Sequence, residues 1–207
     1  MTLEETLARA EKSLFTIWHA FHGEIVSVGP RTQPVLAYVG LGLEHVDSII
    51  ILMKHGNAGS ALALYRPVIE IFWRGSWTAA CATDEQVQSM RKDDFRFPDS
   101  VTLVKDLDKA LGTDEFFHGL HKQTWKALNS YTHSGMLQLA SRYSKGELTP
   151  EYRDDEKISA INSSLIATAL LVTLALRMHN RQTDAATVDT MLAAFTETTR
   201  SVGEQTS

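Results

Sequence analysis

The chain has 207 residues, of which 43% are hydrophobic and 22% charged, with 12 Gly, 5 Pro and one Cys. A chain of this length can bury a core without disulfides or structural metals. Its low Gly and Pro content excludes the collagen-like and disordered classes of protein. The single Cys excludes a disulfide framework and a Cys-based zinc site. The formal net charge of −5 excludes a general nucleic-acid coat protein, and no DNA partner is expected.

The N-terminal half shows helical periodicity. Residues 2–27 form a predicted amphipathic helix because apolar residues recur every three or four positions, and Thr2 with Glu5 makes a capping-box pair at its start. A second helix is predicted over about residues 33–54 by the same spacing.

A third helix is predicted over about residues 58–83, with Asn57 as its N-cap. Pro67 lies in its interior and predicts a kink or an interrupted first half. The following segment, residues 84–115, holds nine acidic residues against five basic ones. We expect short helices and loops there, forming an acidic lid over one end of the bundle.

The C-terminal half contains a long apolar helix. Thr149-Pro150-Glu151 predicts its start, and it extends to about Met178. The apolar run 158–178 is long enough to cross a bilayer, but Ser, Thr and Asn recur in it, which favours a buried core helix. A last helix is predicted over about 184–199, with a frayed tail at 203–207.

These elements predict an all-α fold, since no stretch alternates long enough to form a strand. We expect a single antiparallel helical-bundle domain over residues 1–207, with about five to seven main helices. The acidic N-terminus is unlike a signal peptide. A cytoplasmic protein without membrane contact is therefore the expectation.

The first candidate site lies on the third predicted helix. Its charged residues recur every four positions, which places them in one column on an otherwise apolar helix: Arg66, Glu70 and Arg74. Buried charges need partners. The column is therefore either an internal ladder that fixes helix register or part of a central polar pocket, walled by Tyr65, Trp73 and Trp77.

The second candidate site lies in residues 116–146, where no acidic residue occurs. Polar residues share one helical face there, at Lys126, Asn129, Ser130 and His133. Bases mixed with aromatic residues such as Tyr131 suit RNA contact, and a His beside a cation suits general acid–base catalysis. The alternative is a solvent-exposed helix face on which His133 only makes ordinary hydrogen bonds.

Metal and cofactor motifs are weak. Glu115-x-x-His118 has the spacing of di-iron bundles, but the chain holds no second copy. No phosphate-binding Gly loop or dinucleotide fingerprint is found. We expect no cofactor and no bound metal, and Cys81 is interpreted as an inert core thiol.

Two motifs carry a family resemblance: Tyr65-Arg66-Pro67-Val68-Ile69-Glu70, and Leu128-Asn129-Ser130-Tyr131-Thr132-His133-Ser134-Gly135. Together they resemble uncharacterised bacterial helical families related to the HEPN superfamily and to abortive-infection proteins. The resemblance implies a small helical bundle that dimerises. It also implies a role in toxin–antitoxin or anti-phage systems, in many relatives as a metal-independent endoribonuclease.

Within this resemblance, His133 matches the motif His, and Asn129 matches the polar residue that often follows the motif Arg. Where the Arg is expected, the only basic residue is Lys126, which keeps the charge but loses the bidentate grip on phosphate. The resemblance thus implies an RNA-directed homodimer, active or catalytically degenerate, with RNA or a cognate protein as partner. The alternative is a non-enzymatic dimeric bundle. It would bind a small ligand or partner protein through Arg66, Glu70, Tyr65, Trp73, Arg74 and Tyr131.

Overall fold

The structure is a computed structural model that describes residues 1–22, 29–92, 94–143 and 146–203. Within these ranges the secondary structure is helical, without a strand, so the predicted all-α class is confirmed. The helices are α1 (Leu3–Phe21), α2 (Thr32–Lys54), α3 (Ala58–Ala80), α4 (Asp84–Arg91), α5 (Ser100–Leu111), α6 (Phe116–Thr132), α7 (Met136–Ala140), α8 (Asp154–Met178) and α9 (Gln182–Gly203). The described part thus holds nine helices where five to seven main ones are predicted, and α4 and α7 are the shortest.

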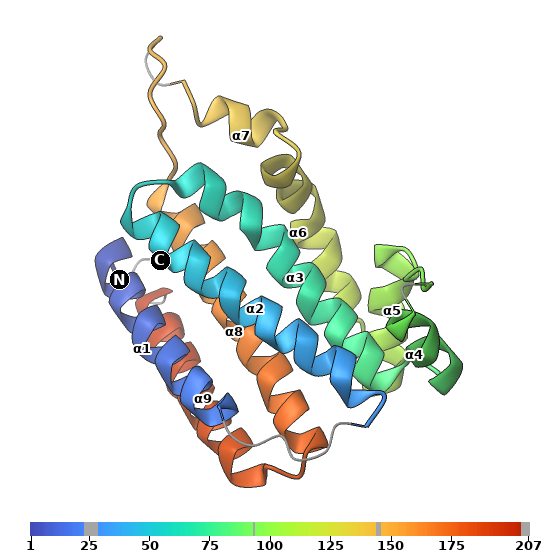
Figure 1. Ribbon diagram of the computed structural model, residues 1–207. Helices are drawn as coiled ribbons and strands as arrows, with labels where there is room; N and C mark the ends of the chain where they lie inside the picture. The colour runs from blue at the N-terminus through green and yellow to red at the C-terminus, as the bar shows by residue number, and fades with distance from the viewer. Residues whose placement is uncertain (23–28, 93, 144–145, 204–207) are drawn as a thin grey trace.

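Helix α8 lies at the centre of the bundle and contacts α1, α2, α3 and α9 (Figure 1). Helices α2 and α3 pack along each other, and α5 and α6 cover one side of α3. Gly75 lets α3 approach α8 closely, because a Cβ there would lie 2.8 Å from Leu171 on α8. The buried side chains of these helices form one continuous core.

Helices α2 and α8 are both long and apolar enough to cross a membrane by length and composition. In α8 the apolar window is 67% buried inside the bundle, and in α2 it is 39% buried. The burial of α8 matches the core helix that its recurring polar residues predict. Because core helices of soluble proteins and membrane spans share these properties, the cellular location stays a prediction.

The ends of the first helices differ from the sequence expectations in detail. The predicted capping box is confirmed, since Thr2 accepts from the N–H of Glu5 and Glu5 accepts from the N–H of Thr2. Helix α1 ends at Phe21, and residues 23–28 of the predicted helix lie outside the described residues. Asn57 occupies the N-cap of α3, but its side chain makes no capping hydrogen bond.

Helix α3 is continuous around Pro67, so the predicted interruption is wrong. Because proline has no N–H, the carbonyl of Ala63, four residues earlier, lacks its helical partner. The hydroxyl of Thr132 donates to this carbonyl at 3.3 Å. The proline therefore leaves an acceptor on α3 to which the end of α6 is bound.

The predicted start of the long apolar helix at residues 149–151 is wrong, since α8 begins at Asp154. The N–H of Glu151 donates to the carbonyl of Ser141 at 2.7 Å, which holds this stretch in a non-helical course. Tyr152 is buried against Gly59, where a Cβ would lie 2.6 Å from the tyrosine hydroxyl. These tertiary contacts outweigh a good local start signal.

The acidic segment forms α4 and α5, and α5 packs against α3 and α6. Asp99 caps α5 by accepting from the N–H groups of Val101 and Thr102. At the end of α3, burial raises the pKa of the Cys81 thiol to about 11, which fits an unreactive thiol. Of the predicted frayed tail, Gly203 ends α9 and residues 204–207 lie outside the described residues.

Candidate functional site

The charged column on α3 forms a ladder within the helix. The Nε of Arg66 donates to Glu70 at 2.7 Å, and Arg74 donates to the second oxygen of the same carboxylate at 3.2 Å. The side chains of Arg66 and Glu70 are 19% and 21% exposed, and that of Arg74 is 44% exposed. Glu70 thus neutralises two guanidinium groups and fixes the direction of Arg66.

His133 contacts this ladder from another helix. A terminal nitrogen of Arg66 donates to the Nε2 of His133, although the two residues are 67 positions apart. A guanidinium has only donors, so the imidazole accepts through Nε2 in this contact. The two candidate clusters, separate in the sequence, therefore form one site.

The end of α6 is built to place His133 beside Arg66. His133 is the C-cap residue of α6, and its N–H donates to the carbonyl of Asn129 at 3.0 Å. The preceding residue, Thr132, is the one bound to the free carbonyl of α3. This bond holds the last turn of α6 against α3 at Ala63, about one helical turn before Arg66.

The turn after His133 requires its particular residues. Ser134 has a positive φ of 53°, and the N–H of Gly135 donates to the carbonyl of Ser130 at 2.7 Å. A Cβ on Gly135 would lie 2.9 Å from the Cα of Ser130, so only glycine fits. The Ser130 hydroxyl accepts from the N–H of Leu137 at 2.9 Å. This side chain, predicted to face RNA, instead orders the start of α7.

Aromatic rings lie beneath the ladder. The guanidinium of Arg66 lies 4.6 Å from the ring centroid of Trp125, a cation–π contact. Trp125 stacks on His121 at 4.9 Å, and His121 lies 5.5 Å from Trp73. From the sequence, Trp125 and His121 belong to the acid-free cluster and His121 could share a metal with His118, but neither is predicted to lie by the ladder. Only the packing of α6 on α3 brings these rings under the charges.

His121 is 6% exposed and makes a 3.0 Å hydrogen bond with the hydroxyl of Ser100. Burial lowers the pKa of this imidazole, and the nearby His118 lowers it further. The neutral imidazole is therefore the favoured form within the aromatic stack.

A hollow of about 190 Å³ adjoins the ladder, hereafter the ladder hollow. It is lined by Arg66, Glu70, Trp73, Arg74, Pro98, Asp99, Ser100, Leu103 and Trp125. Trp73 is 2% exposed, and its Nε1–H has no hydrogen-bond partner among the residues that the structure describes. A buried donor without an acceptor is costly, and this one belongs to a residue that lines the hollow.

Two residues predicted to wall this pocket do not line it. Trp77 donates to Asp106 at 3.1 Å and stacks with Phe95, further along α3. Tyr65 lines a different cleft. Trp77 shares the face of the column but lies one turn beyond Arg74, and Tyr65 lies on another side of α3.

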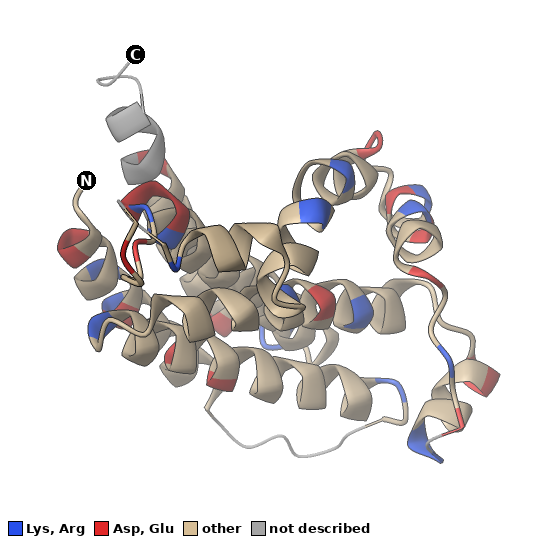
Figure 2. Ribbon diagram, turned by 90° about the horizontal axis from the view of Figure 1, so that it is seen from above, with Lys and Arg blue, Asp and Glu red and all other residues tan. Residues whose placement is uncertain are grey.

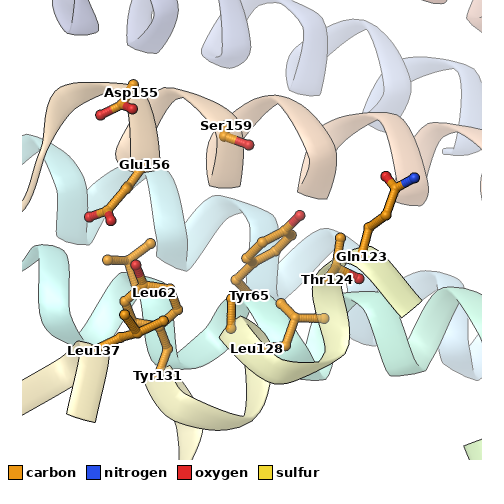
Figure 3. A pocket seen from close by; sticks show the side chains of 11 residues that line it. Leu62, Tyr65, Gln123, Thr124, Leu128, Tyr131, Leu137, Asp155, Glu156 and Ser159 are labelled. Atoms are coloured by element: carbon orange, nitrogen blue, oxygen red, sulfur yellow. The ribbon is translucent and has the colours of Figure 1, made fainter. Parts of the chain in front are cut away.

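That second cleft lies between α6 and α8, with α3 as its floor. It consists of two hollows of about 350 and 270 Å³ that share Tyr65, Thr124 and Ser159, hereafter together the α6–α8 cleft. Figure 3 shows Asp155, Glu156 and Ser159 on one wall, opposite Tyr131 and Leu137. Burial, followed by the charge of Glu156 and a hydrogen bond to it, raises the pKa of Tyr131 to about 12.

The remaining predicted residues lie on α6. Lys126 is exposed and makes no ion pair within the described ranges, and Asn129 is half-buried one turn before His133. Arg66, rather than Lys126, contacts His133. Basic and acidic residues are mixed along the helices in the view of Figure 2. In the described part of the chain, no group of three or more His, Cys, Asp or Glu is placed to hold a metal ion.

The chain belongs to a family of unknown function, DUF6988, whose profile matches residues 39–200. The match covers α3, α6 and α8, and therefore the ladder, His133 and both hollowed regions. Neither the curated proteins nor the solved structures contain a match to this chain. Nothing in the family assignment links the chain to HEPN or abortive-infection proteins, so that resemblance stays a prediction.

Proposed function

We propose that this chain is a HEPN-like helical protein of a bacterial defence or toxin–antitoxin type that acts on RNA. Its phosphodiester site is the pair Arg66 and His133. The observation that carries the proposal is the contact between their guanidinium and imidazole groups. In this proposal Arg66 of α3 takes the place of the motif Arg, which the sequence lacks near Lys126.

The geometry supports a division of roles. Glu70 occupies the Nε of Arg66, which leaves the terminal nitrogens of the guanidinium for two phosphate oxygens. Once Arg66 turns its donors to phosphate, the Nε2 lone pair of His133 becomes free. Lys126 is exposed on the same helix and suits a neighbouring phosphate. Asn129 and Glu70 are positioning residues in this proposal.

The reaction balances without a further reactant. His133 takes the proton of a ribose 2′-hydroxyl, and the 2′-oxygen attacks the adjacent phosphorus. The bond from phosphorus to the 5′-oxygen breaks, and the imidazole returns the proton to that oxygen. The products are a 2′,3′-cyclic phosphate end and a free 5′-hydroxyl end. Arg66 stabilises the charge that develops on the phosphate in the transition state.

The test is incubation of the purified protein with total cellular RNA and a tRNA pool in EDTA. We expect discrete fragments with 2′,3′-cyclic phosphate ends from the wild type and none from His133→Ala. Arg66→Lys is expected to lower the rate at least about tenfold, because it removes the bidentate contact. RNA carrying 2′-O-methyl groups should stay intact.

The matched control is His55→Ala, which removes an exposed His from the C-cap of α2 and should cleave like the wild type. Equal cleavage by His133→Ala and the wild type would refute the catalytic assignment. Intact RNA with the wild type would refute RNA cleavage for these substrates. We also propose a cytoplasmic homodimer, which light scattering after size-exclusion chromatography and cell fractionation would test.

A second candidate function is binding of a small anion in the ladder hollow, which is lined by Trp73, whose Nε1–H has no hydrogen-bond partner among the described residues. Arg74 is 44% exposed there and adds a cationic donor. Inorganic phosphate and succinate are suitable probes, with tryptophan fluorescence as readout since Trp73 and Trp125 line the hollow. Saturable quenching that Trp73→Phe and Arg74→Gln each weaken would support it. Unchanged fluorescence with both probes would refute it.

A further inference from the structure

The α6–α8 cleft is polar at one end and apolar at the other. At the polar end, Asp155 pairs with Arg153 at 2.5 Å, and Asp154 pairs with Lys157 at 2.9 Å. The remaining carboxylate, Glu156, is half-buried and lines the cleft. The Tyr131 hydroxyl is close enough to Glu156 for the carboxylate to raise the tyrosine pKa. Within the described part of the chain Glu156 forms no ion pair, although the charge of Arg153 also acts on it.

The other end of the cleft is apolar along three helices. Its floor and walls are formed by Ile69, Phe72, Phe116, Leu120, Ile166 and Leu170. At the rim, Phe116 is 58% exposed and Leu170 is 39% exposed. Covering the exposed apolar side chains around a hollow with an apolar ligand is favourable, because it removes apolar surface from water.

The size and charge of the cleft restrict what fits. Its two hollows, of about 350 and 270 Å³, have the size of a small-molecule site. None of the described residues that line them is Lys or Arg. Glu156 would therefore repel an anionic head group and attract a cationic one. From Leu62 to Phe72 the floor spans eleven residues of α3, or ten helical rises, which is about 15 Å.

We propose that the α6–α8 cleft binds a small organic cation with an apolar tail. Its ammonium or guanidinium group pairs with Glu156, beside the hydroxyl of Tyr131. Its tail lies along Ile69 and Phe72, between α6 and α8. The floor of this site lies on the side of α3 that adjoins the ladder, with Ile69 three residues after Arg66, and the proposal does not depend on the RNA-directed function.

The test compares four probes by isothermal titration calorimetry with the full chain. The probe n-octylamine has the charge and the tail, methylamine has only the charge, octan-1-ol has only the tail, and octanoate has the tail with the opposite charge. We expect n-octylamine to bind at least about tenfold more tightly than each of the others. Glu156→Gln should remove that preference.

Two further variants separate this site from general attraction to an acidic protein. Glu151→Gln removes an exposed carboxylate close to α8 but outside the cleft, and should bind n-octylamine like the wild type. Leu170→Ser should weaken n-octylamine about threefold through lost apolar contact. The proposal is overturned if octanoate or octan-1-ol binds as tightly as n-octylamine. No detectable n-octylamine binding at millimolar concentration, or an equal loss of affinity in Glu151→Gln and Glu156→Gln, would also overturn it.

Discussion

Helix α3 presents two contrasting sides. One carries the Arg66–Glu70–Arg74 ladder, against which Trp125 and His133 of α6 are packed. The other carries Leu62, Tyr65, Ile69 and Phe72, which form the floor of the α6–α8 cleft. The charged side is thus covered by partners from another helix, whereas part of the apolar side is left open.

The comparison shows that residue type alone does not decide which side of a helix is covered. On the charged side, Pro67 frees a carbonyl that Thr132 occupies, so the end of α6 is held there. On the apolar side, α6 and α8 both contact α3 but leave a cleft between them. Changes on the two sides should therefore have different consequences.

The largest effect is expected from Leu62→Ala, at the floor of the cleft. Leu62 is 1% exposed, so its truncation should lower the free energy of unfolding by about 2–5 kcal/mol. Urea denaturation measures the loss. Leu137→Ala, at the 45% exposed rim, is the matched control and should lose less than about 1 kcal/mol. A loss for Leu62→Ala as small as the one expected for Leu137→Ala would show that the floor is not part of the core.

On the charged side, Glu70→Gln should lower the free energy of unfolding by about 1.5–3 kcal/mol, because two guanidinium groups lose their shared partner. The control is Asp84→Asn, whose side chain is 90% exposed in its pair with Arg31. It should change stability by less than about 0.5 kcal/mol. Equal values for the two variants would contradict a stabilising ladder.

Thr132→Val tests the bond that holds α6 to α3. The isosteric change leaves the carbonyl of Ala63 without a donor and should cost about 1 kcal/mol. In a Pro67→Ala background the cost should be smaller, because the substituted alanine supplies a backbone N–H to that carbonyl. A double-mutant cycle by urea denaturation measures this coupling. Additive losses would show that Pro67 and Thr132 act independently.

The smallest effect concerns pH. The folded-state pKa of His121 lies below its ordinary value of 6.5, so the unfolded chain binds the proton first as pH falls. The contribution of His121 is therefore complete above about pH 6.5 and is lost as pH falls through the folded-state pKa. Urea denaturation at pH 7.5, 6.5 and 5.5 should show a shallower acid loss in His121→Phe than in the wild type. Parallel profiles would contradict a buried, neutral imidazole.

Much of the local structure could be predicted from the sequence. The capping box of Thr2 and Glu5 and the ladder of Arg66, Glu70 and Arg74 depend on residues three or four positions apart. Such pairs meet in any helix, so spacing alone predicts them. The predictions are wrong where contacts with distant segments override the local signal. At residues 149–151, the buried side chain of Tyr152 and the bond from Glu151 to Ser141 prevent the predicted helix start.

The sequence by itself determined the helices and the pairing of charges along α3, because both depend on neighbours within one turn. Tertiary structure decided that Arg66 meets His133 and that Tyr65 and Trp77 lie away from the ladder hollow. It also decided that α6 and α8 leave a cleft with Glu156 at one end. These outcomes depend on how helices pack, and helix packing is set by contacts between residues that are far apart in the sequence.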